Sequence, residues 1–323
     1  MKILVSVSNS LEGAYMKKWC TLLLSFVLCF ALGQNTFAVE VDFENQFSCG
    51  NTAILTATGK TAFVENVTKQ YSDLKTLERQ VTYDVDQVNS LMMEVAFAES
   101  QTIREMYLNK LEELGIYRYS LENCNTPTPM SDSHDIYFDN TEAYYSVQEK
   151  VWIITSSGRW RTEEWHNEKP ATGGNVGCPD VFGVGFTNVS GKYNARVVRC
   201  YGVLRNGWDG EQRRARDTYN RGGGDGATGF YFKLQDSIEM VDTTNKRAAL
   251  EDTYIGSEWF ASCTYSDEFT EYSGIATGFY VHTWNKAVIT GVELGVQDKT
   301  AGLVVKITNQ SFSFPAYGSD VKF

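Results

Sequence analysis

Residues 181–203, VFGVGFTNVSGKYNARVVRCYGV, carry the clearest signal of the fold class. Apolar side chains alternate with small or polar ones on both sides of a polar stretch, at Phe182, Val184 and Phe186 before it and at Ala195, Val197 and Val203 after it. A period of two predicts β-strands, and polar residues with glycine between two such runs predict a turn. The stretch therefore predicts two short strands joined by a turn over residues 188–192.

The same pattern recurs from about His134 to Phe323. Further alternating apolar sets are Phe230, Phe232 and Leu234, then Val292, Leu294 and Val296, then Leu303, Val305 and Ile307. Val151–Thr155 and Arg159–Glu163 flank Ser156-Ser157-Gly158, which predicts a tight hairpin. Short strands separated by turn residues predict an antiparallel β-sandwich-like domain over residues 134–323.

Residues 62–114 have a different pattern, with neither glycine nor proline and with apolar residues in steps of three and four. The stripe consists of Val67, Tyr71, Leu74, Val81, Val85, Val88, Met92 and Val95, continued by Ile103, Tyr107, Leu111 and Leu114. This spacing predicts a long helix or a helical hairpin. Thr102 and Glu105 have the spacing of a capping box, which indicates a break near Ser100, and Gly115 is a typical helix stop.

The helical stripe has two interpretations. Its apolar face packs against the core of its own chain, or it pairs with a second chain in a coiled-coil homodimer. The helical region with a flanking strand is placed at residues 39–124. Two prolines in Asn125–Pro129 then indicate an exposed linker, residues 125–133, before the β-rich domain. The predicted fold class is α+β.

The N-terminal residues predict export. Met16 is followed by Lys17 and Lys18, then by an apolar run over residues 19–32 and by small and polar residues up to Ala38. These are the parts of a secretory signal peptide cut after Ala38, with Met16 as the initiator. The alternative, an anchor in a chain that starts at Met1, needs about 20 apolar residues, and the run is shorter. The predicted location is secreted, extracellular or associated with the cell surface, with no membrane span after processing.

Export makes disulfides the expected state of the cysteines that remain after cleavage. The preferred pairing joins Cys49 to Cys124 and Cys178 to Cys200, and it leaves Cys263 as a buried thiol. Cys178 and Cys200 are paired because they flank the predicted strand pair described first.

Charge excludes some partners. The chain has 40 acidic and 29 basic residues and a formal net charge of −11. Such a surface repels phosphate backbones and anionic lipids, which argues against nucleic acid and membrane surfaces as partners. The triple glycine at 222–224 lacks a preceding strand and a following helix, so it does not predict a phosphate-binding loop, and no cofactor is predicted.

An arginine-rich and glycine-rich stretch, residues 205–229, is the strongest candidate for ligand binding. Guanidinium groups bind carboxylates or phosphates with two hydrogen bonds, and exposed tryptophan rings suit the apolar faces of sugars. The predicted ligand-binding residues are Trp160, Trp165, Trp208, Arg205, Arg213 and Arg214. The leading hypothesis is a non-enzymatic binding or adhesion protein that recognises a glycan or a protein surface through loops of the β domain.

Two other classes of function remain open. A secreted hydrolase of polysaccharide or cell-wall material would use Glu163, Glu164 or Glu258 as acids, although chain spacing does not show the required pair of carboxylates. A self-associating structural protein would use the helical stripe. Cys178 or Cys263 with His282 and Asn285 supplies the residue types of a cysteine hydrolase without a recognisable local motif.

Overall fold

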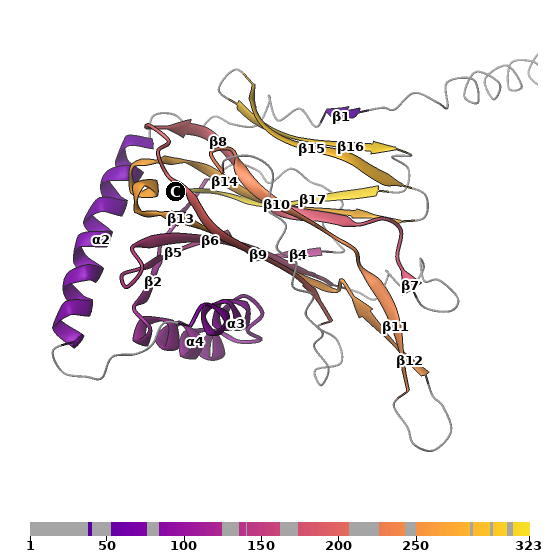
Figure 1. Ribbon diagram of the computed structural model, residues 1–323, viewed down its shortest axis with the longest axis horizontal. Coiled ribbons are helices and arrows are strands. Elements are labelled where there is room, and N and C mark those ends of the chain that lie inside the picture. The colour runs from indigo at the N-terminus through magenta and orange to yellow at the C-terminus, as the bar shows by residue number, and fades with distance from the viewer. Residues whose placement is uncertain are drawn as a thin grey trace, which may run out of the picture. The chain divides into compact units, whose positions relative to one another are not determined.

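The computed structural model (Figure 1) describes most of the chain after residue 37. The described residues are 38–40, 53–75, 84–124, 136–139, 141–161, 174–206, 226–242, 250–284, 287–297, 300–308 and 313–323. The chain divides into two units, Met1–Phe37 and Ala38–Phe323. The predicted signal peptide falls in the first unit, outside the described residues, apart from its last residue, Ala38, and it stays a prediction. Among the described helices, none combines the length and the apolar character that a membrane crossing requires.

Two antiparallel sheets form the centre of the second unit. A five-stranded sheet has the order β10 (Gly229–Leu234), β8 (Asp180–Ser190), β14 (Ser273–Thr283), β17 (Ser313–Lys322) and β3 (Glu122–Asn123). A six-stranded sheet has the order β2 (Ile116–Tyr119), β5 (Glu142–Ser146), β6 (Val151–Trp160), β13 (Glu258–Ser266) and β9 (Val197–Arg205), with β4 (Ile136–Phe138) paired to β6. The mostly β, α+β character predicted from the sequence is confirmed.

The main hydrophobic core joins these two sheets. Its largest buried side chains include Trp152 and Trp259 of the six-stranded sheet and Phe182 and Tyr280 of the five-stranded sheet. Residues of one sheet face those of the other because side chains alternate between the two faces of a strand. Burial of each large apolar side chain contributes about 1.5–3 kcal/mol, so this interface is the main source of stability.

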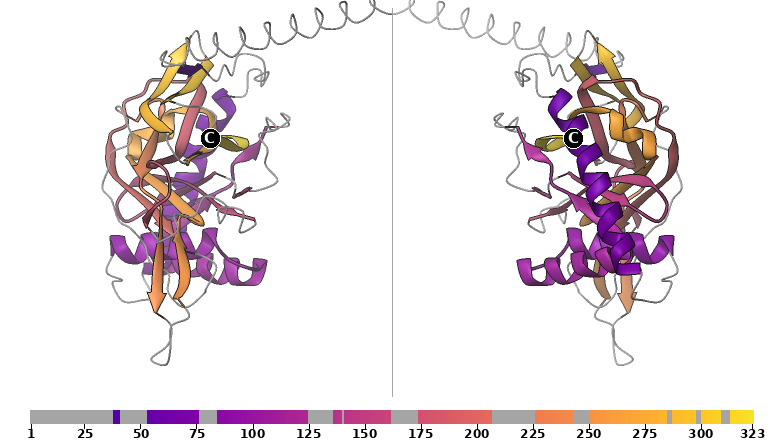
Figure 2. Two further views of the ribbon diagram at one scale, coloured as in Figure 1. Left: turned by 90° about the vertical axis from the view of Figure 1, so that its right-hand side faces the viewer. Right: turned by 90° about the vertical axis from the view of Figure 1, so that its left-hand side faces the viewer.

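Further elements cover the outer faces of both sheets (Figures 1 and 2). Helices α3 (Val85–Ala96) and α4 (Gln101–Glu113) pack on Ile153 and Phe260 of the six-stranded sheet. On the outer face of the five-stranded sheet lie β15 (Val288–Gln297) and β16 (Thr300–Thr308), which form a sheet with β1 (Ala38–Glu40). A third small sheet has the order β12 (Leu250–Ile255), β11 (Ser237–Asp242) and β7 (Gly174–Asn175).

The regions on either side of the predicted linker share sheets. Strand β2 pairs with β5, and β3 pairs with β17, so strands from before residue 125 pair with strands from after it. Residues 125–133 themselves lie outside the described residues. The helical region and the β-rich region therefore contribute to one hydrophobic core.

Of the two predicted forms, a long helix or a helical hairpin with a break near Ser100, a single continuous helix does not occur, because the chain leaves the helical conformation between Ala96 and Gln101. The described helices are α2 (Ala53–Lys75), α3 and α4. The predicted break is confirmed, because Ser100 caps α4 and its Oγ accepts a hydrogen bond from the Ile103 amide at 3.3 Å. The predicted stop is also confirmed, since Gly115 has a φ of 73°.

Part of the apolar stripe packs against the rest of the same chain. Its buried members are Val67, Tyr71, Val88, Met92, Val95, Leu111 and Leu114. They pack on the sheets, as the first interpretation of the stripe expects. The other interpretation, a coiled-coil homodimer through the helical segment, stays a prediction.

The predicted hairpin over residues 156–158 is wrong. Strand β6 runs without a turn from Val151 to Trp160, and both serines are buried. Gly158 is needed for close packing, because a Cβ at this position would come within 2.1 Å of the Trp259 ring. The strands predicted from the alternating sets around Leu294 and Leu303 are confirmed, since β15 and β16 pair with Leu294 opposite Leu303.

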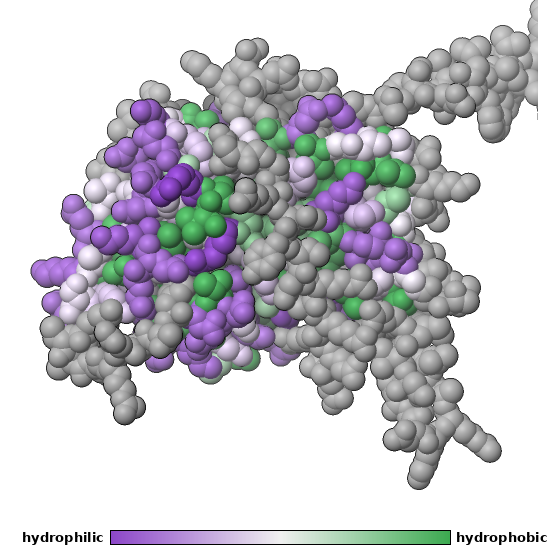
Figure 3. Space-filling view, viewed as in Figure 1, coloured by the Kyte–Doolittle hydropathy of each residue, from purple (hydrophilic) through white to green (hydrophobic). Residues whose placement is uncertain are grey.

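Helix α2 is fixed to the sheets by a buried lysine. Lys60 is 1% exposed, and its Nζ donates hydrogen bonds to the carbonyl oxygens of Phe269, at 3.1 Å, and Tyr272. The same Nζ lies 4.8 Å from the centre of the Phe269 ring and 5.1 Å from that of Phe323. Loss of hydration lowers the pKa of Lys60 to about 7. The outward side of α2 is polar, and hydrophilic residues predominate there in Figure 3.

The cysteine geometry does not support a Cys178–Cys200 bridge. The strands on which that prediction rests, β8 and β9, belong to different sheets. Cys200 instead lies directly opposite Cys263 on paired strands, and their Sγ atoms are 2.8 Å apart. Cys49 lies outside the described residues, so the Cys49–Cys124 bridge stays a prediction.

We expect the substitution Lys60→Met to flatten the pH dependence of stability. Between pH 7 and pH 10 the unfolded lysine binds a proton that the folded one has lost, so the free energy of unfolding of the native protein rises with pH. The rise should be about 1 kcal/mol or more between pH 7 and pH 9, measured by urea denaturation. Lys69→Met, at an exposed position of α2, is the control and should keep the native slope. Equal slopes for Lys60→Met and the native protein would contradict a buried, neutral Lys60.

We expect Cys200 and Cys263 to form the disulfide when the protein is oxidised. With oxidised glutathione, the two thiols lose two hydrogen atoms and glutathione disulfide is reduced to two thiols. Mass spectrometry of a non-reduced digest should show peptides containing Cys200 and Cys263 joined, and Cys178→Ser should leave this link intact. A peptide that joins Cys178 to Cys200 would contradict this prediction.

Candidate functional site

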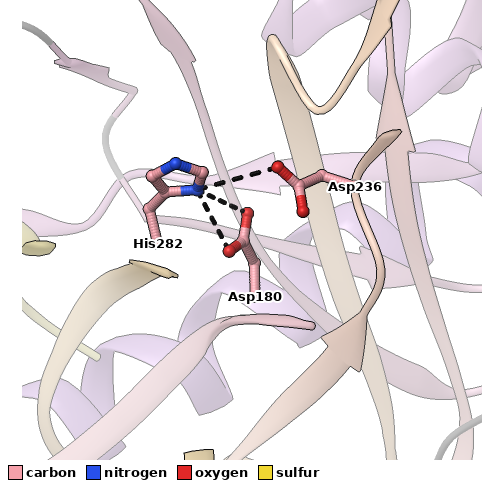
Figure 4. A group of neighbouring side chains, drawn as sticks. All are labelled: Asp180, Asp236 and His282. Carbon is pink, nitrogen blue, oxygen red and sulfur yellow. Dashed lines mark hydrogen bonds and ion pairs between the residues drawn. The ribbon is translucent and has the colours of Figure 1, made fainter. Parts of the chain in front are cut away.

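A cluster of ionisable side chains lies inside the core (Figure 4). Asp180 begins β8, Asp236 lies between β10 and β11, and His282 is near the end of β14. All three side chains are at most 1% exposed. They are far apart in the sequence, and the antiparallel pairing of β8 with β10 and β14 brings them together.

Hydrogen bonds orient both carboxylates. The His282 Nδ1 lies 3.1 Å from each oxygen of Asp180 and 3.8 Å from Oδ2 of Asp236. Asp180 also accepts hydrogen bonds from the Tyr280 hydroxyl at 2.7 Å and from the Thr283 amide at 2.9 Å. The Tyr254 hydroxyl donates to Asp236 at 2.7 Å.

Burial dominates the electrostatics of the cluster. Loss of hydration raises the pKa of Asp236 well above its usual range, and the negative charge of Asp180 raises it further. Burial also raises the pKa values of Tyr254 and Tyr280, so both phenols stay protonated and donate. The cluster can hold a proton or a cation between its acids. Its burial separates it from any polymeric substrate, which argues against catalysis on such a substrate at this position.

Trp160 forms part of the wall of this cluster. Its ring lies 5.1 Å from the His282 ring at an interplanar angle of 81°, and only 7% of the residue is exposed. The expectation that Trp160 is an exposed ring for sugar stacking is therefore wrong. The Trp284 ring also stacks on the His282 ring, with the two ring centres 5.9 Å apart.

A second polar group lies at one end of the six-stranded sheet. Tyr137, Arg159, Glu258 and Arg205 are register partners across four neighbouring strands. Arg205 Nε donates to Glu258 Oε2 at 2.5 Å, and the guanidinium lies 4.2 Å from the centre of the Phe97 ring. Both charged side chains are less than 10% exposed.

This ion pair corrects two expectations. Arg205 is the last residue of β9 and a buried partner of Glu258, so it is not an exposed residue of a binding loop. Glu258 is bound to that arginine and is buried, so it does not face a substrate cleft as an acid of glycoside hydrolysis must. Breaking such a buried pair is strongly destabilising, so both residues have a structural role.

The exposed part of this sheet end is aromatic and cationic. Tyr137 is 49% exposed, and the guanidinium carbon of Arg161 lies 3.9 Å from the centre of its ring. The Arg159 guanidinium carbon lies 5.6 Å from the same ring. Arg161 Nε donates to the Ile136 carbonyl at 3.1 Å, which fixes the base of the side chain. We call Tyr137, Arg159 and Arg161 the tyrosine–arginine patch.

The other predicted site residues lie outside the described residues. They are Trp165, Trp208, Arg213, Arg214, Glu163 and Glu164. Residues 162–173 follow directly after Arg161, and residues 207–225 follow directly after Asn206. These two departure points lie at the same end of the six-stranded sheet, because Arg159 and Arg205 are both register partners of Glu258.

Sequence reasoning missed the buried acids. Asp180 precedes an apolar alternating run, and Asp236 follows another closely. The sequence suggests His282 only as a partner of a Cys178 or Cys263 nucleophile. The structure pairs His282 with Asp180, and it places Cys263 opposite Cys200. A charged residue at the edge of a buried strand is the one local signal that these positions offer.

Comparisons with known proteins give no family. No protein-family model matches the chain, and no curated protein matches it. Among solved structures, one described as "pH-induced modulation of Streptococcus parasanguinis adhesion by Fap1 fimbriae" covers 65% of this chain and 89% of its own. The TM-score is 0.20 and the sequence identity 9%, so the likeness carries no argument about function.

Proposed function

We propose that this chain is an exported, non-enzymatic binding or adhesion protein that recognises an acidic glycan at one end of its six-stranded sheet. Its action outside the cell rests on the signal peptide predicted from residues 16–38. A protein surface is the alternative ligand, and polysaccharide hydrolysis and self-association are the alternative functions.

The strand register is the observation that carries the proposal. It places the tyrosine–arginine patch at the same sheet end from which residues 162–173 and 207–225 depart. The first of these segments contains Trp165, and the second contains Trp208, Arg213 and Arg214. Aromatic and guanidinium side chains suit the apolar faces and the carboxylates of acidic sugars, respectively.

The local charge fits this ligand class. Tyr137 carries two guanidinium groups close to its ring in a protein whose net charge is −11. The only acid in this register row, Glu258, is already paired with Arg205. Arg159 of this row and Arg161, just beyond the end of β6, are therefore the cations that we propose for a ligand carboxylate.

The hydrolase alternative has less support among the described residues. Glu258 is bound to a buried arginine, and Asp180 and Asp236 lie inside the core. Retaining and inverting glycosidases need two carboxyl groups that face a substrate cleft. Glu163 and Glu164 lie outside the described residues and remain the acids on which that alternative depends.

The test uses oligosaccharides of uronic acids and their neutral counterparts, immobilised on an array. We expect the purified protein to bind the acidic set and to lose affinity in high salt, because exposed charge pairs are screened. Tyr137→Ala and Arg161→Ala should each weaken binding about tenfold, the effect expected of a central contact.

Tyr107→Ala is the matched control for the array experiment. Tyr107 is also an aromatic residue beside a cation, with the Lys110 Nζ 4.9 Å from its ring centre, but it lies on α4. The control should bind like the native protein. Absence of binding to every acidic glycan, or equal effects of the three substitutions, would refute the proposal.

A further inference from the structure

We propose that Asp180, Asp236 and His282 bind one divalent transition-metal ion, of which Zn²⁺ is the representative. The site does not depend on the glycan-binding function proposed above, because it lies in the core rather than at the sheet end. Its role is structural, since all three side chains are buried.

The distances between the ligand atoms fit a shared ion. One nitrogen and two carboxylate oxygens, one from each aspartate, lie within 4.8 Å of one another. Atoms bound to one Zn²⁺ at about 2.0–2.2 Å are separated by about 3–3.5 Å. The His282 Nδ1 lies 3.1 Å from Asp180 and 3.8 Å from Asp236, so small side-chain shifts bring the three atoms onto one ion.

The ligands are already held in place. Figure 4 shows the carboxylates of Asp180 and Asp236 directed toward the same nitrogen of His282. Tyr280 and Thr283 donate to Asp180, and Tyr254 donates to Asp236. Hydrogen bonds of this kind to ligand carboxylates orient metal ligands in known sites and maintain their affinity.

The charge of the cluster also favours a cation. Two buried carboxylates face one imidazole, and the hydrogen-bonding partners described for them are Tyr, Thr, Gln and His groups, with no lysine or arginine among these partners. Buried charges in proteins are normally paired or coordinate metals. A divalent ion with two carboxylates and a neutral imidazole gives a neutral group.

The ligand chemistry indicates the class of ion. One imidazole nitrogen with two carboxylate oxygens suits Zn²⁺, Mn²⁺ or Fe²⁺ better than Ca²⁺, which prefers six to eight oxygen ligands. A bound ion would connect β8 and β14 to the start of β11. It would thus fix the point at which the chain leaves the five-stranded sheet for the third sheet.

The experiment compares protein refolded from urea with EDTA and protein refolded with Zn²⁺, because a closed site exchanges its ion slowly. After removal of excess metal, elemental mass spectrometry should find one Zn²⁺ per chain in the protein that was refolded with Zn²⁺. Its Tm should be higher by about 4 °C or more. The same refolding experiment is repeated with Mn²⁺ and with Ca²⁺, and Ca²⁺ should not raise the Tm.

Two variants remove ligands with little change of shape, Asp236→Asn and His282→Gln. Each should bind less than about a tenth of the native amount, and its Tm should not respond to Zn²⁺. Asp320→Asn is the matched control, since Asp320 is a buried acid of the same sheet that pairs with Thr277. It should keep one ion per chain. The double variant Cys200→Ser/Cys263→Ser excludes the cysteine pair as the binding site and should also keep the ion.

The competing explanation is a proton shared between the two acids. It predicts that the native protein has the same Tm whether it is refolded with or without Zn²⁺, and that it binds no stoichiometric Zn²⁺, Mn²⁺ or Ca²⁺. That result would overturn the proposal, whether or not the ligand variants fold. Loss of the ion in the cysteine double variant, with Asp236→Asn unaffected, would also overturn it.

Discussion

The stack of Trp259 on Tyr280 holds the two central sheets against each other. The two rings lie 4.1 Å apart and nearly parallel, and they come from strands β13 and β14 of different sheets. Aromatic pairs of this kind contribute about 0.5–1.5 kcal/mol beyond the burial of their area. Gly158 leaves room for the Trp259 ring, and the Tyr280 hydroxyl donates to Asp180. Apolar packing and the buried polar cluster are therefore coupled.

The chain places ionisable groups in its core in two ways. Lys60 is surrounded by aromatic rings and carbonyl oxygens, with loss of hydration as the dominant effect on its pKa. The Asp180 cluster instead combines two carboxyl groups, one imidazole and several hydrogen-bond donors. Uncompensated buried charges are costly, so each group must stabilise its surroundings through several contacts at once. Both groups tie together elements that are distant in sequence. Lys60 links α2 with η2 (Asp267–Glu271), and the Asp180 cluster links β8 and β14 with the connection between β10 and β11.

Local patterns in the sequence predict the strands well where burial alternates. The strand around Phe182 is confirmed because Phe182, Val184 and Phe186 all face the main core, and the alternating sets around Leu294 and Leu303 are confirmed as paired strands. The serines before Gly158 mislead the prediction, since buried polar residues inside a strand resemble a turn when tertiary contacts are unknown. The site could not be found by spacing, because Asp180 and His282 meet only through strand pairing between β8 and β14.

A double-mutant cycle on Trp259 and Tyr280 tests whether the two sheets depend on this stack. The free energy of unfolding is measured by urea denaturation for the native protein, Trp259→Leu, Tyr280→Leu and the double variant. We expect a coupling free energy of about 1 kcal/mol or more, because the two rings stabilise each other across the sheets. Additive effects within about 0.3 kcal/mol would contradict this role of the stack, since they would mean that the two sheets do not depend on the contact.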